Sequence, residues 1–272
     1  MIGAIIGDVV GSRFEFYNIK TKEFELITNE SEFTDDTVLT IAVMDWLLHA
    51  ETKDSASAAE YLKKWARKYP YAGYGSRFIH WKDKYASAPY NSCGNGSAMR
   101  VSGVGWVSDN PETVKLLSDT ITGVTHNHPE GMKGAYVTAE LIRMARTGAS
   151  KEEMKSFAKN NYNIDFDYDD LVRNYCHGAE ICQETVPQAL YCFFISDSFE
   201  DCLRTTISIG GDCDTTAAIS CAVAEAFYGE IPKSLVDNVI NKLPDDLIKI
   251  IEEFNKVFPN STSYHLDEQK EG

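Results

Sequence analysis

The chain has few positive charges, no closely spaced cysteine pair and no long apolar run. Its 26 Lys and Arg residues stand against 41 Asp and Glu residues, which gives a formal net charge of −15. This surplus of negative charge argues against a nucleic-acid backbone as the main partner. No stretch approaches the roughly 18 apolar residues of a membrane span, and the first residues lack the basic region of a signal peptide. We therefore expect a cytoplasmic protein without a membrane partner.

The cysteines are not arranged for cross-linking or for zinc. There are seven of them, an odd number, and no two occur as Cys-x-x-Cys. Most lie within apolar or helical-looking stretches, which is typical of reduced and buried thiols. Cys213 is the exception because it stands between two acidic residues. We interpret it as a filler, since hard cations do not select thiols.

Alternation of polar and apolar residues, the mark of a strand, is nearly absent, and residues 23–28 are the one candidate. Helical periodicity dominates instead. Besides two apolar stretches described below, the expected helical segments are 3–11, 55–69, 112–121, 131–146, 151–159, 187–195, 199–208, 232–242 and 244–258. The sequence thus predicts an all-α fold, a compact single-domain orthogonal bundle of a dozen or more helices. This domain should span residues 1–258, followed by a polar tail at 259–272.

Two acidic clusters carry the strongest indication of function, TDDT at residues 34–37 and GGDCDT at residues 210–215. Each is followed by a stretch so apolar that it must be a buried helix. Asp and Thr are ordinary helix caps, but a cap needs one acceptor and each cluster supplies two acids plus a hydroxyl. Carboxylates at the mouth of a buried helix are costly unless neutralised. The clusters therefore favour a site for magnesium or manganese over capping alone.

The first residues contain a second pattern. Residues 3–11, GAIIGDVVG, place small side chains at helical spacing, which allows close packing against another helix. Glu15 follows between Phe14 and Phe16. A carboxylate in an apolar setting usually has a partner, and the metal centre is one candidate. A surface glutamate beside two core aromatics is the alternative.

Two polar turns complete the motifs. Residues 92–100, SCGNGSAMR, form a turn rich in free N–H groups that can cradle a phosphate, although an ordinary tight turn also explains it. In residues 125–131, THNHPEG, the pair His126 and His128 permits zinc binding or general-base catalysis. Beside magnesium-type ligands, neutral histidines that hydrogen-bond a sugar or phosphate fit better. A loop before the helix start at Pro129 is the plain alternative.

Together these motifs resemble, in order and spacing, those of the ADP-ribosylglycohydrolase family. The segments concerned are GAIIGDVVG, FTDDT, GNGSAMR, THNHPEG and GGDCDTTAA. The resemblance covers residue 3 to about residue 229. It implies a compact all-α fold with a central cleft that holds two Mg²⁺ or Mn²⁺ ions.

The resemblance also implies roles for individual residues. The implied metal ligands are Thr34, Asp35, Asp36, Asp212, Asp214 and Thr215. The implied substrate-binding residues, for diphosphate and ribose, are Asn95, Gly96, Ser97 and His126. Glu15 matches an acidic residue that gates the pocket, and the candidate catalytic carboxylates are Glu15, Asp35 and Asp36. With two divalent ions, the charges of such a site nearly balance, as burial requires.

The implied activity is metal-dependent hydrolysis of an N- or O-glycosidic bond that releases ADP-ribose, with ADP-ribosyl-arginine on proteins as the expected substrate. Serine-linked or nucleic-acid-linked ADP-ribose, an ADP-ribose-binding module without hydrolysis, and a di-metal phosphohydrolase are the alternatives. Variable loops such as residues 68–89 would select the leaving group. Tyr74, Tyr85 and Trp81 in that loop either form an aromatic wall or pack as an ordinary surface. The sequence leaves the choice of metal, the general acid or base and the oligomeric state open, with a monomer as the working expectation.

Overall fold

The structure, a computed structural model, describes residues 1–84, 88–176, 178 and 180–259. Within these residues there are thirteen α-helices and three short 3₁₀-helices, and one isolated bridge between Gly94 and Ile181 is the only β pairing. The predicted all-α fold is confirmed. Apart from Pro259, the expected polar tail lies outside the described residues.

The helix boundaries follow from caps and from apolar spacing. In chain order the α-helices are α1 (Gly3–Gly11), α2 (Asp35–His49), α3 (Ser55–Lys68), α4 (Ser76–Lys82), α5 (Pro111–Gly123), α6 (Pro129–Arg146), α7 (Lys151–Asn161), α8 (Tyr168–Asn174), α9 (Cys182–Ile195), α10 (Phe199–Ile209), α11 (Cys213–Tyr228), α12 (Lys233–Ile240) and α13 (Asp245–Val257). The 3₁₀-helices are η1 (Ser12–Phe14), η2 (Asn95–Ser97) and η3 (Ser102–Trp106). Every segment expected to be helical overlaps one of these helices. The short helices α4 and α8 were not expected, and α9 starts before residue 187.

The candidate strand at residues 23–28 was wrong. The segment runs irregularly over the surface, where Phe24 and Leu26 pack against the core from alternate positions. Arginine side chains donate hydrogen bonds to backbone carbonyl oxygens in this segment and next to it. Arg204 donates to the carbonyl oxygens of Lys22 and Phe24 at 3.0 and 2.9 Å. A period of two therefore arises here without a sheet.

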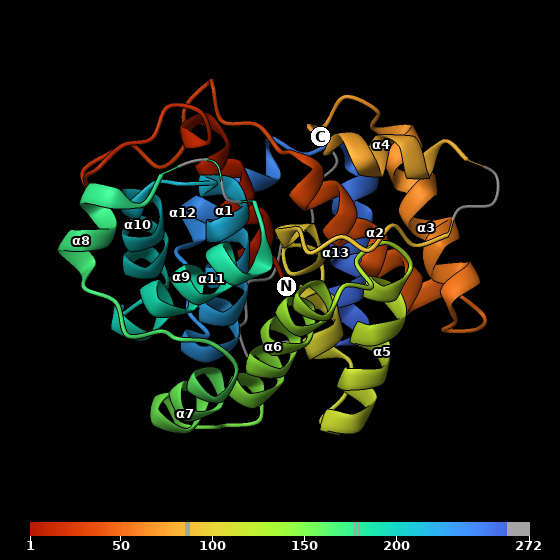
Figure 1. Ribbon diagram of the computed structural model, residues 1–272. Helices are drawn as coiled ribbons and strands as arrows, with labels where there is room; N and C mark the ends of the chain where they lie inside the picture. The colour runs from red at the N-terminus through yellow and green to blue at the C-terminus, as the bar shows by residue number, and fades with distance from the viewer. Residues whose placement is uncertain (85–87, 177, 179, 260–272) are drawn as a thin grey trace.

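Helices α1 and α11 pack against each other at the centre of the bundle (Figure 1). A Cβ atom at Gly7 would lie 2.3 Å from the backbone of Ala217, and one at Gly3 would lie 2.4 Å from the carbonyl oxygen of Cys221. Glycine at these positions is what allows the two backbones to touch. The small-residue spacing of the first helix thus has the packing role that the sequence predicted.

The remaining helices flank this pair. Helices α8, α9 and α10 lie on one side in Figure 1, and α2, α3, α4 and α5 lie on the other. Helix α2 contacts α1, α3 and α13, while α11 contacts α6, α9 and α10. The start of α2 and the start of α11 therefore meet beside α1. In the described part of the chain, no helix combines the length and apolar character needed to cross a bilayer.

Candidate functional site

A cleft of about 460 Å³ opens where α2 and α11 begin. Most residues that the sequence assigned to a site line this one cleft. They are Glu15, Thr34, Asp35, Asp36, Asn95, Gly96, His126, Asp212, Asp214 and Thr215. Segments far apart in the sequence are thus brought to a single place.

The first acidic cluster is fixed by the start of α2 and by a carboxylate from α1. Thr34 caps α2 by accepting a hydrogen bond from the Asp36 N–H at 3.3 Å. Asp8, which is completely buried, accepts from the N–H groups of Thr34 and Thr37 at 2.9 and 3.0 Å. It also accepts from the Thr34 hydroxyl at 2.7 Å. The interpretation as a cap therefore holds for Thr34, but it leaves the carboxylates of Asp35 and Asp36 unexplained.

The second cluster follows a turn in which Gly210 and Gly211 have φ of 77° and 81°. Asp212 stands at the N-cap of α11 without a side-chain capping bond to the described residues of that helix. Its Oδ2 instead accepts a hydrogen bond from the side-chain amide of Asn95 at 2.6 Å. The Thr215 hydroxyl donates to Asp36 Oδ2 at 3.1 Å, which joins the two clusters across 179 positions of sequence.

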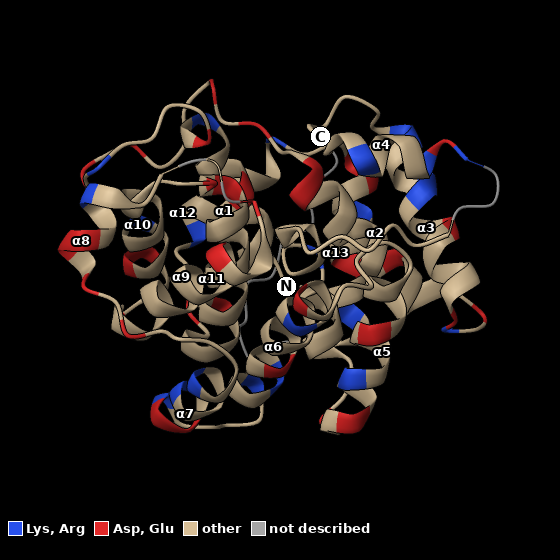
Figure 2. Ribbon diagram, viewed as in Figure 1, with Lys and Arg blue, Asp and Glu red and all other residues tan. Residues whose placement is uncertain are grey.

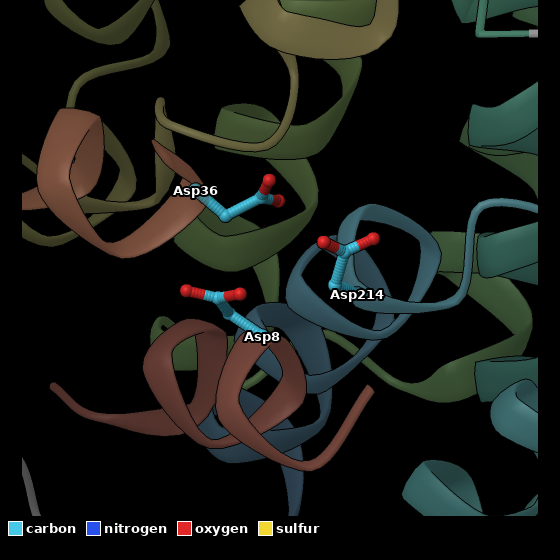
Figure 3. Close-up of side chains that lie close together, drawn as sticks. All are labelled: Asp8, Asp36 and Asp214. Carbon is cyan, nitrogen blue, oxygen red and sulfur yellow. The ribbon is translucent and has the colours of Figure 1, made fainter. Parts of the chain in front are cut away.

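Three buried carboxylates converge in the cleft from three different helices. Asp8 comes from α1, Asp36 from α2 and Asp214 from α11, and the side chains point toward one another (Figure 3). One oxygen of each lies within 4.8 Å of the others, and a second group with the same spacing contains Glu15, Asp212 and Asp214. Asp36 Oδ1 is buried and has no hydrogen-bond partner among the described residues. An orphaned carboxylate oxygen within such groups is what a hard cation requires.

The raised pKa values of these carboxyl groups reflect a lack of positive charge in the cluster. Burial, followed by the charge of Asp8, raises the pKa of Asp36 well above its usual value. Burial and the charge of Asp212 raise the pKa of Asp214 in the same direction. Burial and the same Asp212 charge raise the pKa of Glu15 to about 7. A bound cation would favour the charged form of each group, because opposite charge stabilises a carboxylate.

The cleft also contains hydrogen-bond donors. Arg100 is fully buried and donates to the Thr125 hydroxyl at 2.7 Å, and that hydroxyl lies 2.8 Å from His126 Nδ1. The donation from Arg100 leaves the hydroxyl proton free to bind Nδ1, and in that arrangement the proton of a neutral ring lies on Nε2. Burial, followed by the charge of Arg100, holds the pKa of His126 well below its usual range. His126 therefore presents a neutral N–H donor near Gly96.

Asn95, Ser97 and His128 use their side chains for contacts within the protein. The Asn95 amide nitrogen is committed to Asp212 and to Thr185, so that Asn95 orients a candidate ligand. Ser97 is not among the described residues that line the cleft, and its hydroxyl donates to the carbonyl oxygen of Gly131 at 2.8 Å. His128 caps α6 by accepting from the Glu130 N–H at 3.1 Å. The plain interpretation of residue 128 as a helix start is thus confirmed.

Tyr74 and Trp81, two aromatic residues of the segment 68–89, do not line the described part of the cleft. Tyr74 and Trp81 are buried against Phe78, with ring centroids 5.4 Å apart in both pairs. Tyr85 lies outside the described residues. From this segment the cleft is lined by Gly73, Gly75, Ser76, Arg77 and Phe78.

Cys213, interpreted as a filler, is buried and far from ionising. Its sulfur lies 3.9 Å from the carbonyl oxygen of Ile207 and 3.6 Å from the Asn18 amide nitrogen. Burial and the charge of Asp212 raise the pKa of this thiol to about 12. Its placement agrees with the interpretation. Five of the seven cysteines are buried, and all are free thiols.

Sequence reasoning missed four residues of the site. Asp8 was read only as part of a small-residue helix, although a lone carboxylate between apolar residues was a usable signal. Arg100 was quoted within the GNGSAMR motif without a role. Arg77 and Tyr90 carried no motif at all, yet both line the cleft, with the guanidinium 5.0 Å from the ring centroid.

The family of the chain follows from comparison with known proteins. Its sequence matches the family model described as ADP-ribosylglycohydrolase over residues 1–263. ADP-ribosylhydrolase ARH3 of Mus musculus is 27% identical, with 86% of this chain and 84% of the relative covered. The ADP-ribosyl-[dinitrogen reductase] glycohydrolase of Rhodospirillum rubrum is 24% identical, with 92% of each covered.

A third relative and a solved structure give the same result. ADP-ribosylarginine hydrolase Tri1 of Pseudomonas putida is 24% identical, with 91% of this chain and 76% of the relative covered. A solved structure described as an ADP-ribosylglycohydrolase-related protein complex has the same fold, with a TM-score of 0.70 at 21% identity. It covers 94% of this chain and 95% of the other. The chain belongs to the ADP-ribosylglycohydrolase family, a family of glycosidic-bond hydrolases.

Proposed function

We propose that this protein is a metal-dependent hydrolase that releases ADP-ribose from ADP-ribosylated proteins, with arginine as the modified side chain. One observation carries the proposal. Two acidic clusters from distant parts of the sequence converge in one cleft, with carboxylate oxygens within 4.8 Å of one another. The same cleft contains the neutral donor His126 and the cation Arg77.

The residues present fit two Mg²⁺ or Mn²⁺ ions. Asp214 belongs both to the set with Asp8 and Asp36 and to the set with Glu15 and Asp212. This shared carboxylate gives two cations adjacent positions. Thr34, Asp35 and Asp36 would bind from the side of α2. Asp212, Asp214 and Thr215 would bind from the side of α11. When bound, such ions supply positive charge that polarises substrate oxygens and an attacking water.

The polarity of the cleft orients an ADP-ribosyl group. Carboxylates line the cleft where α2 and α11 begin, whereas Arg77 of α4 and His126, which precedes α6, supply a cation and an N–H donor. Basic residues gather on α3 and α4, the latter bordering the cleft (Figure 2). A diphosphate is most stable near the donors and the cation, which directs the distal ribose toward the acidic clusters.

The chain's own carboxylates provide the acid–base chemistry. Glu15, at the edge of the cleft, has its pKa raised to about 7 and is therefore able to give or take a proton near neutral pH. Asp35 is partly exposed to the cleft and is the second candidate for this role. Positive charge that develops on the ribose as the glycosidic bond breaks is stabilised by the surrounding carboxylates.

Arginine as the acceptor is supported by charge and by a relative. Glu15 and the exposed Glu180 line the mouth of the cleft, where a guanidinium leaving group would meet two carboxylates. The Pseudomonas putida relative is named an ADP-ribosylarginine hydrolase. A serine hydroxyl would gain little from two negative charges at this place.

The test is release of free ADP-ribose from ADP-ribosylarginine and ADP-ribosylserine proteins, with Mg²⁺, with Mn²⁺ and with EDTA. We expect metal-dependent release, faster from arginine. Faster release from serine would overturn arginine as the modified side chain but would still support a hydrolase. Metal-dependent binding of ADP-ribose without cleavage of either substrate would favour a binding module. Release of phosphate from a nucleotide would favour a phosphohydrolase.

A further inference from the structure

We propose that Asn18 is a positioning residue that ties the Glu15 segment to the turn before Asp212, and so fixes the distance between Glu15 and the second acidic cluster. Asn18 belongs to neither cluster and does not line the described part of the cleft. The proposal rests on the proposed function only in treating Glu15 as part of the site.

The Asn18 side chain makes hydrogen bonds to both segments at once. Its amide nitrogen donates to the carbonyl oxygens of Phe14 at 2.7 Å and Glu15 at 3.1 Å. The same nitrogen lies 2.9 Å from the carbonyl oxygen of Gly211, and its Oδ1 accepts from the Gly211 N–H at 2.8 Å. One amide thus joins the backbone of its own segment to that of Gly211, which lies 193 positions after Asn18 in the sequence.

The two segments need such a bridge because their side chains repel each other. Carboxylate oxygens of Glu15, Asp212 and Asp214 lie within 4.8 Å of one another. Neither joined segment is regular at the point of contact, since Glu15 follows η1 and Gly211 has φ of 81°. Without a tie, like charges would separate them whenever no cation is bound.

Only a side chain that both donates and accepts can make this set of bonds. In Asn18→Asp the shape is kept, but a carboxylate oxygen replaces the donor that faces three carbonyl oxygens. In Asn18→Ala the bonds are removed without new repulsion. Lys20 offers a matched control, because its Nζ donates to the carbonyl oxygens of Ile209 and Tyr175, both at 2.6 Å. It anchors the same segment beside the same turn without contacting the backbone of Glu15 or Gly211.

The experiment measures Mn²⁺ affinity by isothermal titration calorimetry in the full chain. The variants are Asn18→Asp, Asn18→Ala and Lys20→Met, each made alone and together with Glu15→Gln. We expect Asn18→Asp to weaken Mn²⁺ binding about 10- to 100-fold, the range for residues that orient metal ligands. Asn18→Ala should weaken it by less. In the Glu15→Gln background both losses should shrink to about twofold, because the repulsion that the amide opposes is gone.

Kinetics and melting temperature separate positioning from general stability. We expect Asn18→Asp to lower kcat more than it raises KM, and Lys20→Met to lower the melting temperature while Mn²⁺ affinity stays within about twofold. Equal losses in both Glu15 backgrounds would overturn the proposal, as would a Lys20→Met loss as large as that of Asn18→Asp. If the unaltered protein cleaves no ADP-ribosyl substrate, the proposed function fails while the Mn²⁺ titrations still decide the role of Asn18.

Discussion

The two acidic clusters reach the same cleft but are stabilised there by different means. At the start of α2, the Thr34 hydroxyl and the buried Asp8 carboxylate accept backbone N–H groups of the cluster itself. At the start of α11, side-chain amides from distant segments make the stabilising hydrogen bonds. Asn95 donates to Asp212, and Asn18 binds both backbone groups of Gly211.

The difference lies in how far along the sequence the partners come from, since Asp8 is 26 and 29 positions from the residues it binds, whereas Asn95 and Asn18 are 117 and 193 positions from theirs. A helix start that is capped locally keeps its geometry when a ligand is removed, because its N–H groups are already satisfied. A glycine turn fixed by side chains from elsewhere keeps its geometry only while those side chains stay in place. We therefore expect the first cluster to keep its geometry better than the second when a supporting side chain is replaced.

Loss of one carboxylate from either cluster should have the largest effect. Asp36→Ala and Asp214→Ala should each abolish Mn²⁺ binding and lower turnover at least about 10³-fold, since both residues belong to the shared group of acids. Calorimetry and ADP-ribose release check this. Asp45→Asn is the control on α2, because Asp45 is buried but paired with Lys64 at 2.7 Å. If either alanine variant keeps full activity, the two clusters do not form one centre.

Substitution of the residues that support each cluster should affect the two clusters to different extents. Asp8→Asn replaces the carboxylate that faces three hydrogen-bond donors with an amide. It should reduce metal affinity about 10- to 100-fold and also lower the melting temperature. Asn95→Ala removes one hydrogen bond to Asp212 and should reduce metal affinity less, with a smaller change in melting temperature. Both are measured by calorimetry and thermal unfolding. A larger melting-temperature loss for Asn95→Ala would reverse the comparison.

Metal removal should make stability depend on pH. In the metal-free protein, the pKa of Asp36 and Asp214 is raised by burial and by neighbouring acids, and that of Glu15 is raised to about 7. Groups whose folded pKa is raised stabilise the fold below the unfolded value and lose that contribution as pH increases. With EDTA, the free energy of unfolding should therefore fall by about 1 kcal/mol or more between pH 5 and pH 8, and the melting temperature should fall with it.

With saturating Mn²⁺, the same pH change should have little effect, since the cation replaces the protons. Thermal unfolding at both pH values, with and without metal, tests this. A metal-free protein that becomes more stable toward pH 8 would contradict the charge shortage assigned to the cluster.

Separation of α1 from α11 should affect both clusters by a smaller amount. Gly7→Ala places a Cβ atom 2.3 Å from the Ala217 backbone and should lower the free energy of unfolding by about 1–3 kcal/mol. Because Asp8 follows Gly7 and Asp214 lies near Gly11, metal affinity should fall too. Gly123→Ala is the control, since its Cβ meets only the Met132 methyl group at 4.0 Å. Denaturant unfolding distinguishes the two, and equal losses would remove the packing argument.

Local chemistry made part of this protein predictable from its sequence. Apolar spacing and caps indicated every long helix, and Gly229 ends α11 with φ of 72°, as a C-cap glycine should. The acidic clusters stood out because Asp35, Asp36, Asp212 and Asp214 exceed what capping needs. These features depend on residues within a few positions of one another, which is the range that propensity and periodicity describe.

Tertiary structure decided which polar side chains face the cleft. Ser97 and Asn95 share one turn, yet the first turns to Gly131 and the second to Asp212. Asp8 joined the site because three glycines let α1 touch α11, and Asn18 joined it because the chain folds back beside Gly211. Such contacts depend on segments far apart in the sequence, whose relative placement is set by packing of the whole core. The sequence therefore supplied the chemical groups, and long-range packing decided which of them meet.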